Sequence, residues 1–126
     1  MRRLHSTKGP DLCERTFKFG VRVTKLVRRL PRDVAGYEIG RQVLRSGTSV
    51  GANTEEADAA ESTDDFLHKL KIALKEAQET RFWLRNIRES ELLFDKEVDS
   101  LLQEINELIK ILNTIITNTT RSKFAK

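Results

Sequence analysis

Residues that form turns or cross-links are scarce in this chain. Its 126 residues include six glycines and two prolines, too few turn formers for an all-β fold but enough for a few long helices. Cys13 is the one cysteine, so an internal disulfide and a thiolate metal cluster are excluded. Because cysteine is often buried, we expect Cys13 to be a small core residue.

Histidines are also scarce, and this bears on catalysis. The two in the chain are His5, near the N-terminus, and His68, so no Ser-His-Asp or Cys-His arrangement can be argued. Asp65 and His68 have the three-residue spacing found in carboxylate-bridged di-metal bundles, but such a site needs a second pair from another helix. We therefore interpret the acidic residues between positions 55 and 65 as a solvated helix junction. The sequence predicts no enzyme, no metal and no cofactor.

Long hydrophobic runs are absent as well. No run approaches the length of a membrane span, and the residues that follow Met1-Arg2-Arg3 lack the apolar core of a signal peptide. We expect a cytoplasmic protein with no membrane partner.

Apolar residues recur three and four positions apart over four segments of the chain. The segments are residues 11–30, 33–60, 63–89 and 95–120, and Asp11, Ser62 and Asp95 stand where N-caps are expected. Pro31 is expected to end the first segment, and the polar residues 117–126 are expected to fray. This spacing predicts one domain over residues 1–126: an all-α, antiparallel up-down-up-down four-helix bundle of left-handed twist.

The second segment is unusual for a helix because it contains four glycines. At about 100° per residue, however, all four fall within an arc of about 60°; they are Gly36, Gly40, Gly47 and Gly51. Such a stripe indicates that a neighbouring helix approaches closely, whereas scattered glycines would indicate loops. We predict a continuous or slightly bent helix, with a break near Gly47 as the alternative.

Positive charge is concentrated in the first half of the chain, where residues 1–50 hold 12 Lys and Arg against 4 Asp and Glu. On the first predicted helix, cations share one face within about 80° and span about 21 Å. This basic line is either a solvated face or a contact surface for several phosphates. It comprises Arg15, Lys18, Arg22, Lys25 and Arg29, extended by Arg28 and Arg32.

Two further sets of residues do not fit a simple core pattern. A polar stripe shares one face of the second predicted helix, opposite the glycines, and is either solvated or part of a network between helices or subunits; it comprises Arg45, Ser49, Asn53 and Glu56. On the third predicted helix, three large apolar residues lie off the heptad positions, which favours self-association; they are Ile72, Phe82 and Trp83.

Residues 45–57, Arg-Ser-Gly-Thr-Ser-Val-Gly-Ala-Asn-Thr-Glu-Glu-Ala, resemble the signature of the four-helix-bundle family of 23S rRNA intervening sequence proteins, first recognised as reading frames inside insertions of bacterial 23S rRNA genes. Residues 66–79 and 108–112 resemble the matching patterns of the third and fourth helices. The resemblance implies a ring-like homopentamer. It also extends to the accessory bundle protein of diversity-generating retroelements, which partners a reverse transcriptase and nucleic acid.

The resemblance also implies a set of shared residues with a structural role, namely Arg45, Glu56, Glu76 and Glu79. We expect Arg45 to pair with Glu79 or Glu76. For function, two classes stay open. The first is a non-enzymatic module that binds nucleic acid, RNA in particular, through the basic line; the second is a protein-interaction scaffold without a nucleic-acid role.

Overall fold

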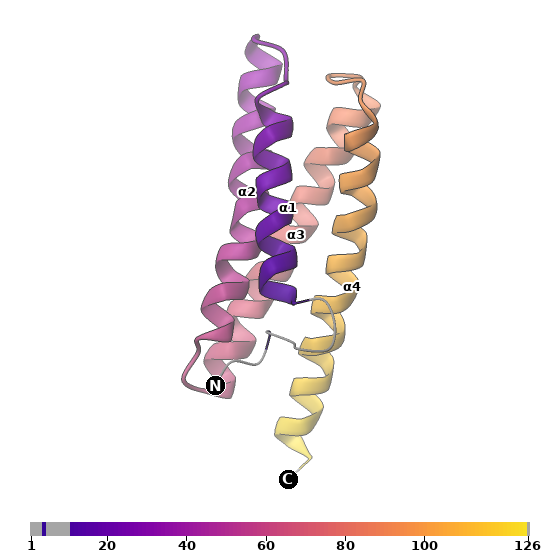
Figure 1. Ribbon diagram of the computed structural model, residues 1–126. Helices are drawn as coiled ribbons and strands as arrows, with labels where there is room; N and C mark the ends of the chain where they lie inside the picture. Colours follow the sequence, from indigo (N-terminus) through magenta and orange to yellow (C-terminus); the bar gives the residue numbers. More distant parts are fainter. Residues whose placement is uncertain (1–3, 5–10, 126) are drawn as a thin grey trace.

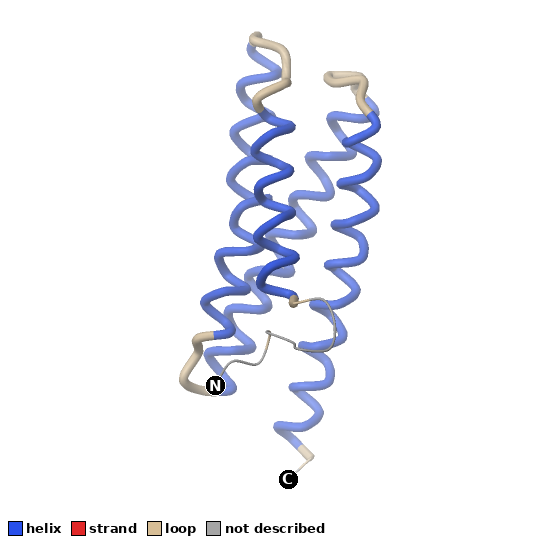
Figure 2. Tube along the Cα trace, in the orientation of Figure 1, coloured by secondary structure: helices blue, strands red, loops and turns tan. Residues whose placement is uncertain are grey.

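The computed structural model describes Leu4 and residues 11–125, so His5 and the rest of the N-terminal tail lie outside the described residues. The secondary structure of the described part is helical (Figure 2), which confirms the predicted all-α four-helix bundle. The helices are α1 (Leu12–Val27), α2 (Val34–Asp58), α3 (Thr63–Glu89) and α4 (Lys96–Phe124). No helix among these residues is long and apolar enough to cross a membrane.

Each helix begins at a side chain that caps its free backbone amides. The oxygen of Asp11 accepts from the backbone N–H of Glu14 at 3.1 Å, and that of Asp33 accepts from Gly36 at 2.8 Å. Ser62 and Asp95 cap α3 and α4 in the same way. The N-cap positions expected from the sequence are therefore confirmed, because this signal depends on only a few neighbouring residues.

The helix ends follow the sequence less closely. α1 was expected to reach residue 30 but ends at Val27, because Pro31 has no N–H to donate to the carbonyl of Val27. That carbonyl instead accepts from the N–H of Leu30 at 3.2 Å, in a tighter turn.

At the other end of the chain, the expected fraying from residue 117 is wrong, because α4 continues to Phe124. Lys123 forms an ion pair with Asp64 of α3. Arg121 and Lys123 also complement the negative end of the helix dipole.

The helices pack side by side in the order in which they occur in the chain. α1 packs on α2, α2 on α3 and α3 on α4, whereas α1 touches α4 much less extensively. Figure 1 shows that consecutive helices run in opposite directions; the left-handed twist stays a prediction. The core between them contains Phe19, Leu70, Leu84 and Leu108, and it includes Cys13, which is fully buried as expected.

The glycine stripe lets α1 and α2 approach closely, as the spacing predicted. α2 is continuous over 25 residues, so the alternative of a break near Gly47 is wrong. A Cβ atom placed on Gly47 would lie 2.9 Å from Cγ1 of Val23, and one on Gly51 would lie 3.1 Å from the carbonyl oxygen of Thr16. A larger residue at either position would therefore push the two helices apart.

Candidate functional site

Three arginines of the basic line face carboxylates on α4 or at its N-cap. Arg15 donates from Nε and Nη2 to Glu104 at 2.7 and 2.8 Å, and from Nη2 to Glu107 at 2.5 Å. Arg22 donates to both carboxylate oxygens of Glu97 at 3.0 Å. Arg29 pairs with Asp95. These contacts add to the packing between α1 and α4, which is less extensive than that of the consecutive helices.

The ion pairs of Arg15, Arg22 and Arg29 form what we call the seam between α1 and α4. Hydrogen bonds in the seam shift the pKa values of some of its groups. The hydrogen bonds from Arg22 hold the pKa of Glu97 below its ordinary value, and the same contact raises the pKa of the Arg22 guanidinium. Hydrogen bonding to Glu104 likewise raises the pKa of Arg15. Arg15 and Arg22 are thus engaged with α4, and Arg29 pairs with Asp95 while its side chain stays 46% exposed.

The remaining cations of the basic line are exposed. Lys18 lies 4.0 Å from Glu14, and Lys25, Arg28 and Arg32 have no ion pair within the described part of the chain. Arg28 and Arg32 lie in the turn between α1 and α2, beside a surface pocket of about 550 Å³. The structure thus separates the predicted line into a paired part and an unpaired end.

Two residues of α2 complete this pocket and are absent from the sequence predictions. Arg41 lies on its wall and is 3.8 Å from Glu38, with both side chains largely in solvent. Tyr37 also lines the pocket and is 59% exposed. Their spacing of four residues, directly after a turn rich in arginine, is the signal that could have found them.

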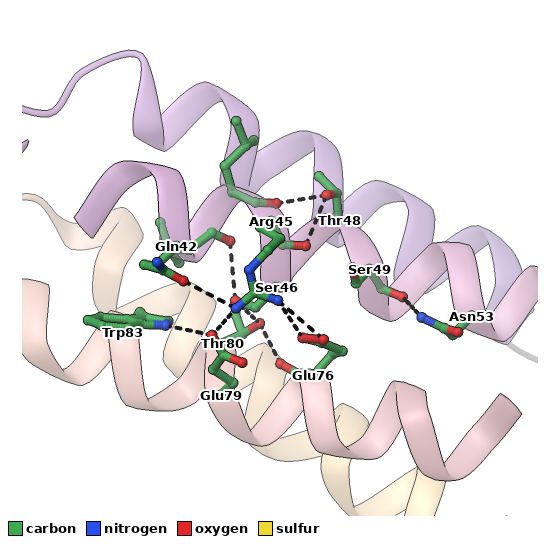
Figure 3. Close-up of polar contacts among 12 residues, drawn as sticks. Gln42, Arg45, Ser46, Thr48, Ser49, Asn53, Glu76, Glu79, Thr80 and Trp83 are labelled. Carbon is green, nitrogen blue, oxygen red and sulfur yellow. Dashed lines mark hydrogen bonds and ion pairs between the residues drawn. The ribbon is translucent and has the colours of Figure 1, made fainter. Parts of the chain in front are cut away.

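A second polar cluster surrounds Arg45 between α2 and α3 (Figure 3). Arg45 donates from Nη1 to both oxygens of Glu76 at 3.3 Å and pairs with Glu79. Trp83 donates from Nε1 to Glu79 at 3.0 Å, and Gln42 accepts from Arg45 at 3.3 Å. The expected partners of Arg45 are confirmed, but its side chain is 47% exposed, so the pair belongs to the surface.

The other members of the polar stripe do not join this cluster. Asn53 donates within α2 to the carbonyl oxygen of Ser49 at 2.9 Å (Figure 3), and Glu56 pairs with Lys69 of α3 at 2.8 Å. The stripe is therefore a set of separate local contacts rather than one network.

The predicted interface residues on α3 do not form one patch. At about 100° per residue, Ile72 and Trp83 share a face while Phe82 lies about 100° away from Trp83. The rings of Phe82 and Trp83 touch edge to face, with centroids 4.9 Å apart. Phe82 is 56% exposed, whereas Trp83 is half-buried and bonded to Glu79. Of the three, Phe82 is the one most available to a partner.

An exposed apolar pair on α1 is missing from the sequence predictions. Phe17 and Val21 are 59% and 37% exposed and border a groove of about 340 Å³ between α1 and α2. Both lie off the heptad positions of α1, so the reasoning that selected Phe82 would have selected them too.

The acidic junction shows no arrangement suited to a metal. Asp65 and His68 are both exposed at the start of α3. Within residues 11–125 and Leu4, no three His, Cys, Asp or Glu side chains gather closely enough to hold an ion.

Comparison with known proteins agrees with the sequence resemblance. A crystal structure of a protein of unknown function from the S23 ribosomal protein family of Bacteroides thetaiotaomicron is 38% identical to the chain, with a TM-score of 0.78. The similarity covers 83% of this chain and 97% of that one. The comparison with curated proteins gave no match. Residues 10–114 match the family described as 23S rRNA-intervening sequence protein, and the chain belongs to that family.

Proposed function

We propose that the protein is a non-enzymatic, oligomeric helical bundle that binds RNA through its phosphates, acting in the cytoplasm. The contact surface is the turn between α1 and α2 rather than the whole length of α1. The observation that carries this proposal is the set of exposed cations there without a close carboxylate. Lys25, Arg28 and Arg32 have no ion pair within the described residues, and Arg41 is held only loosely by Glu38.

The local charge supports an anionic partner. Five cations and two acids lie between residues 25 and 41. Arg29 is paired with Asp95 and Asp33 is the N-cap of α2, which leaves four cations and one acid. Exposed cations of this kind attract phosphates and release counterions on binding. The family name refers to an insertion in 23S rRNA, so RNA is the anionic partner we choose to test.

Binding should therefore be tested with variants of this turn. We expect Arg28→Glu/Arg32→Glu/Arg41→Glu to abolish binding of a fluorescent RNA, measured by anisotropy at low and moderate salt. Wild-type affinity should fall steeply with salt and depend little on sequence.

The matched control makes the same change in net charge at exposed cations elsewhere. Lys71→Glu/Lys110→Glu/Arg121→Glu replaces three such residues on α3 and α4, and it should bind RNA with no more than a small loss. Equal losses in both triple variants would mean that net charge alone governs binding. Absence of wild-type binding at low salt would end the RNA proposal.

Self-association is the second part of the proposal, with a pentamer as the expected state. The exposed apolar side chains Phe17, Val21 and Phe82 support it, because such residues are candidates for burial between copies. Light scattering should give a mass near five chains for wild type and a smaller mass for Phe17→Ser/Phe82→Ser. A monomer at micromolar concentration would refute it. Trp83 is a poor test residue, because its indole also supports Glu79.

A scaffold for another protein remains the alternative function. The groove beside Phe17 and Val21 favours it, since the groove is lined mainly by apolar and small side chains from α1 and α2. Failure of RNA binding, together with an oligomer mass that Phe17→Ser alone leaves unchanged, would make this the leading proposal.

A further inference from the structure

The pocket at the turn between α1 and α2 is lined by both cationic and apolar side chains. Three arginines from different segments line it: Arg28 follows α1, Arg32 lies in the turn, and Arg41 lies in the second turn of α2. Leu30 and Pro31 add an apolar part. The volume of about 550 Å³ is within the range of small-ligand sites.

The ring of Tyr37 is the most unusual element of this pocket. It is 59% exposed on a pocket wall, and its hydroxyl has no hydrogen bond within the described part of the chain. Tyr37 and Arg41 are four residues apart on α2, so their side chains are neighbours on one helical face. A cation and an exposed aromatic surface therefore lie side by side.

The backbone under Tyr37 is fixed before any ligand binds. Asp33 caps α2 through the N–H of Gly36, and the N–H of Tyr37 donates to the carbonyl oxygen of Asp33 at 2.9 Å. A Cβ atom on Gly36 would lie 1.8 Å from the carbonyl oxygen of Pro31, so the turn and the helix start are in direct contact. Such a wall needs little ordering on binding.

We propose that this pocket holds one nucleotide of a single-stranded nucleic acid, with its base stacked on Tyr37 and its phosphate on the surrounding arginines. Exposed aromatic rings beside a cationic groove are the means by which proteins bind unpaired bases without sequence readout. A duplex keeps its bases stacked on one another and cannot use the ring. The proposal rests on the RNA-binding function above and adds the strand form and the stacking residue.

The test compares wild type, Tyr37→Ala and Tyr37→Phe against three probes of about ten nucleotides, a length within the usual range of single-strand sites. The probes are oligouridine, an abasic strand with the same number of phosphates, and an RNA duplex of equal length. Binding is measured by anisotropy at low salt, and circular dichroism checks that each variant melts like wild type.

Tyr37→Ala removes the ring on which one base stacks. Its affinity for oligouridine should therefore be about tenfold lower than that of wild type. Tyr37→Phe keeps the ring and should bind like wild type. Both variants should bind the abasic strand and the duplex like wild type, because those probes offer no free base. Arg41→Gln, in contrast, should weaken binding of all three probes through the lost phosphate contact.

The outcomes separate this inference from the function on which it rests. Wild-type binding of oligouridine that Tyr37→Ala leaves unchanged would overturn the stacking proposal while the RNA-binding function stands. An equal loss by Tyr37→Ala on the duplex or the abasic strand would also overturn it. If wild type binds none of the three probes, the RNA-binding function itself is wrong.

Discussion

The pair formed by Arg22 and Glu97 allows a direct test of the seam between α1 and α4. Both carboxylate oxygens accept from the guanidinium at 3.0 Å, and Arg22 also donates to the hydroxyl of Ser100 at 2.7 Å. The two side chains are 34% and 31% exposed. We therefore consider a double-mutant cycle of Arg22→Met, Glu97→Gln and the double variant, which isolates the interaction between the two residues.

The expected coupling is about 1 kcal/mol. Fully exposed pairs give about 0.2–1 kcal/mol, and the two-pronged geometry and partial burial place this pair at the upper end of that range. A loss of about 1 kcal/mol corresponds to a fall in melting temperature of about 4 °C for a domain of this size.

The coupling should also depend on pH. The hydrogen bonds from Arg22 lower the pKa of Glu97 in the folded protein, so the stabilisation is present above the unfolded carboxyl pKa. It is lost as the pH falls through the lower, folded value. Urea unfolding of the four proteins, followed by circular dichroism at equal concentration, should thus show the coupling at pH 7 and much less of it near pH 3. A coupling below about 0.3 kcal/mol at pH 7, or an equal value at both pH values, would refute the assigned role.

Three further changes probe the packing, each measured by urea unfolding. Gly47→Ala should destabilise by about 1 kcal/mol, because the new Cβ would lie 2.9 Å from Val23 and the overpacking exceeds the gain in helix propensity. In a Val23→Ala background that loss should disappear, and an unchanged loss would contradict the contact. Arg45→Ala should cost about 1 kcal/mol, since its side chain is 47% exposed; a loss near 3 kcal/mol would indicate a buried pair. Thr80→Val should cost about 1 kcal/mol, because Ser46 loses a buried hydrogen bond of 2.9 Å, and a neutral result would show that this bond adds nothing.

Much of the fold could be predicted because its signals are local. Asp11 and Ser62 cap helices through amides three residues away. Contacts between such near neighbours can be predicted from a short stretch of sequence. The stripe that includes Gly47 and Gly51 predicts close packing once the segment is assumed to be a helix. Missing side chains on one face indicate that a neighbouring helix lies close to that face. The partners of Arg45 were accessible through the family resemblance.

The part of the candidate site that could not be predicted depends on contacts between distant segments. Arg15 is 89 residues from Glu104, and Arg22 is 75 residues from Glu97. A face of cations on one helix looks the same in sequence whether water, phosphate or a carboxylate lies opposite. The missed signal was the matching interval, because both arginines and both acids are seven residues apart. Antiparallel helices bring such heptad-spaced charges into register.

The position where α4 begins explains why the cations of the first half divide into two groups. Asp95 caps α4 and pairs with Arg29, which follows α1, so the row of carboxylates opposite α1 starts at the N-cap of α4. Arg32 lies past this point in the turn, and Arg28 is exposed without a carboxylate partner in the described structure. The positive charges that are not paired in the seam, those of Arg28 and Arg32, therefore lie at the end of the bundle.

This division decides which variants can report on binding. Reversing Arg22 or Arg29 to Glu would place two acids opposite each other in the seam, where like charges repel. A loss of RNA binding in such a protein could therefore come from a loosened bundle. Reversing Arg28 and Arg32 leaves every α1–α4 ion pair intact. The loss of binding can then be assigned to the missing phosphate contacts, provided that the variant melts like wild type.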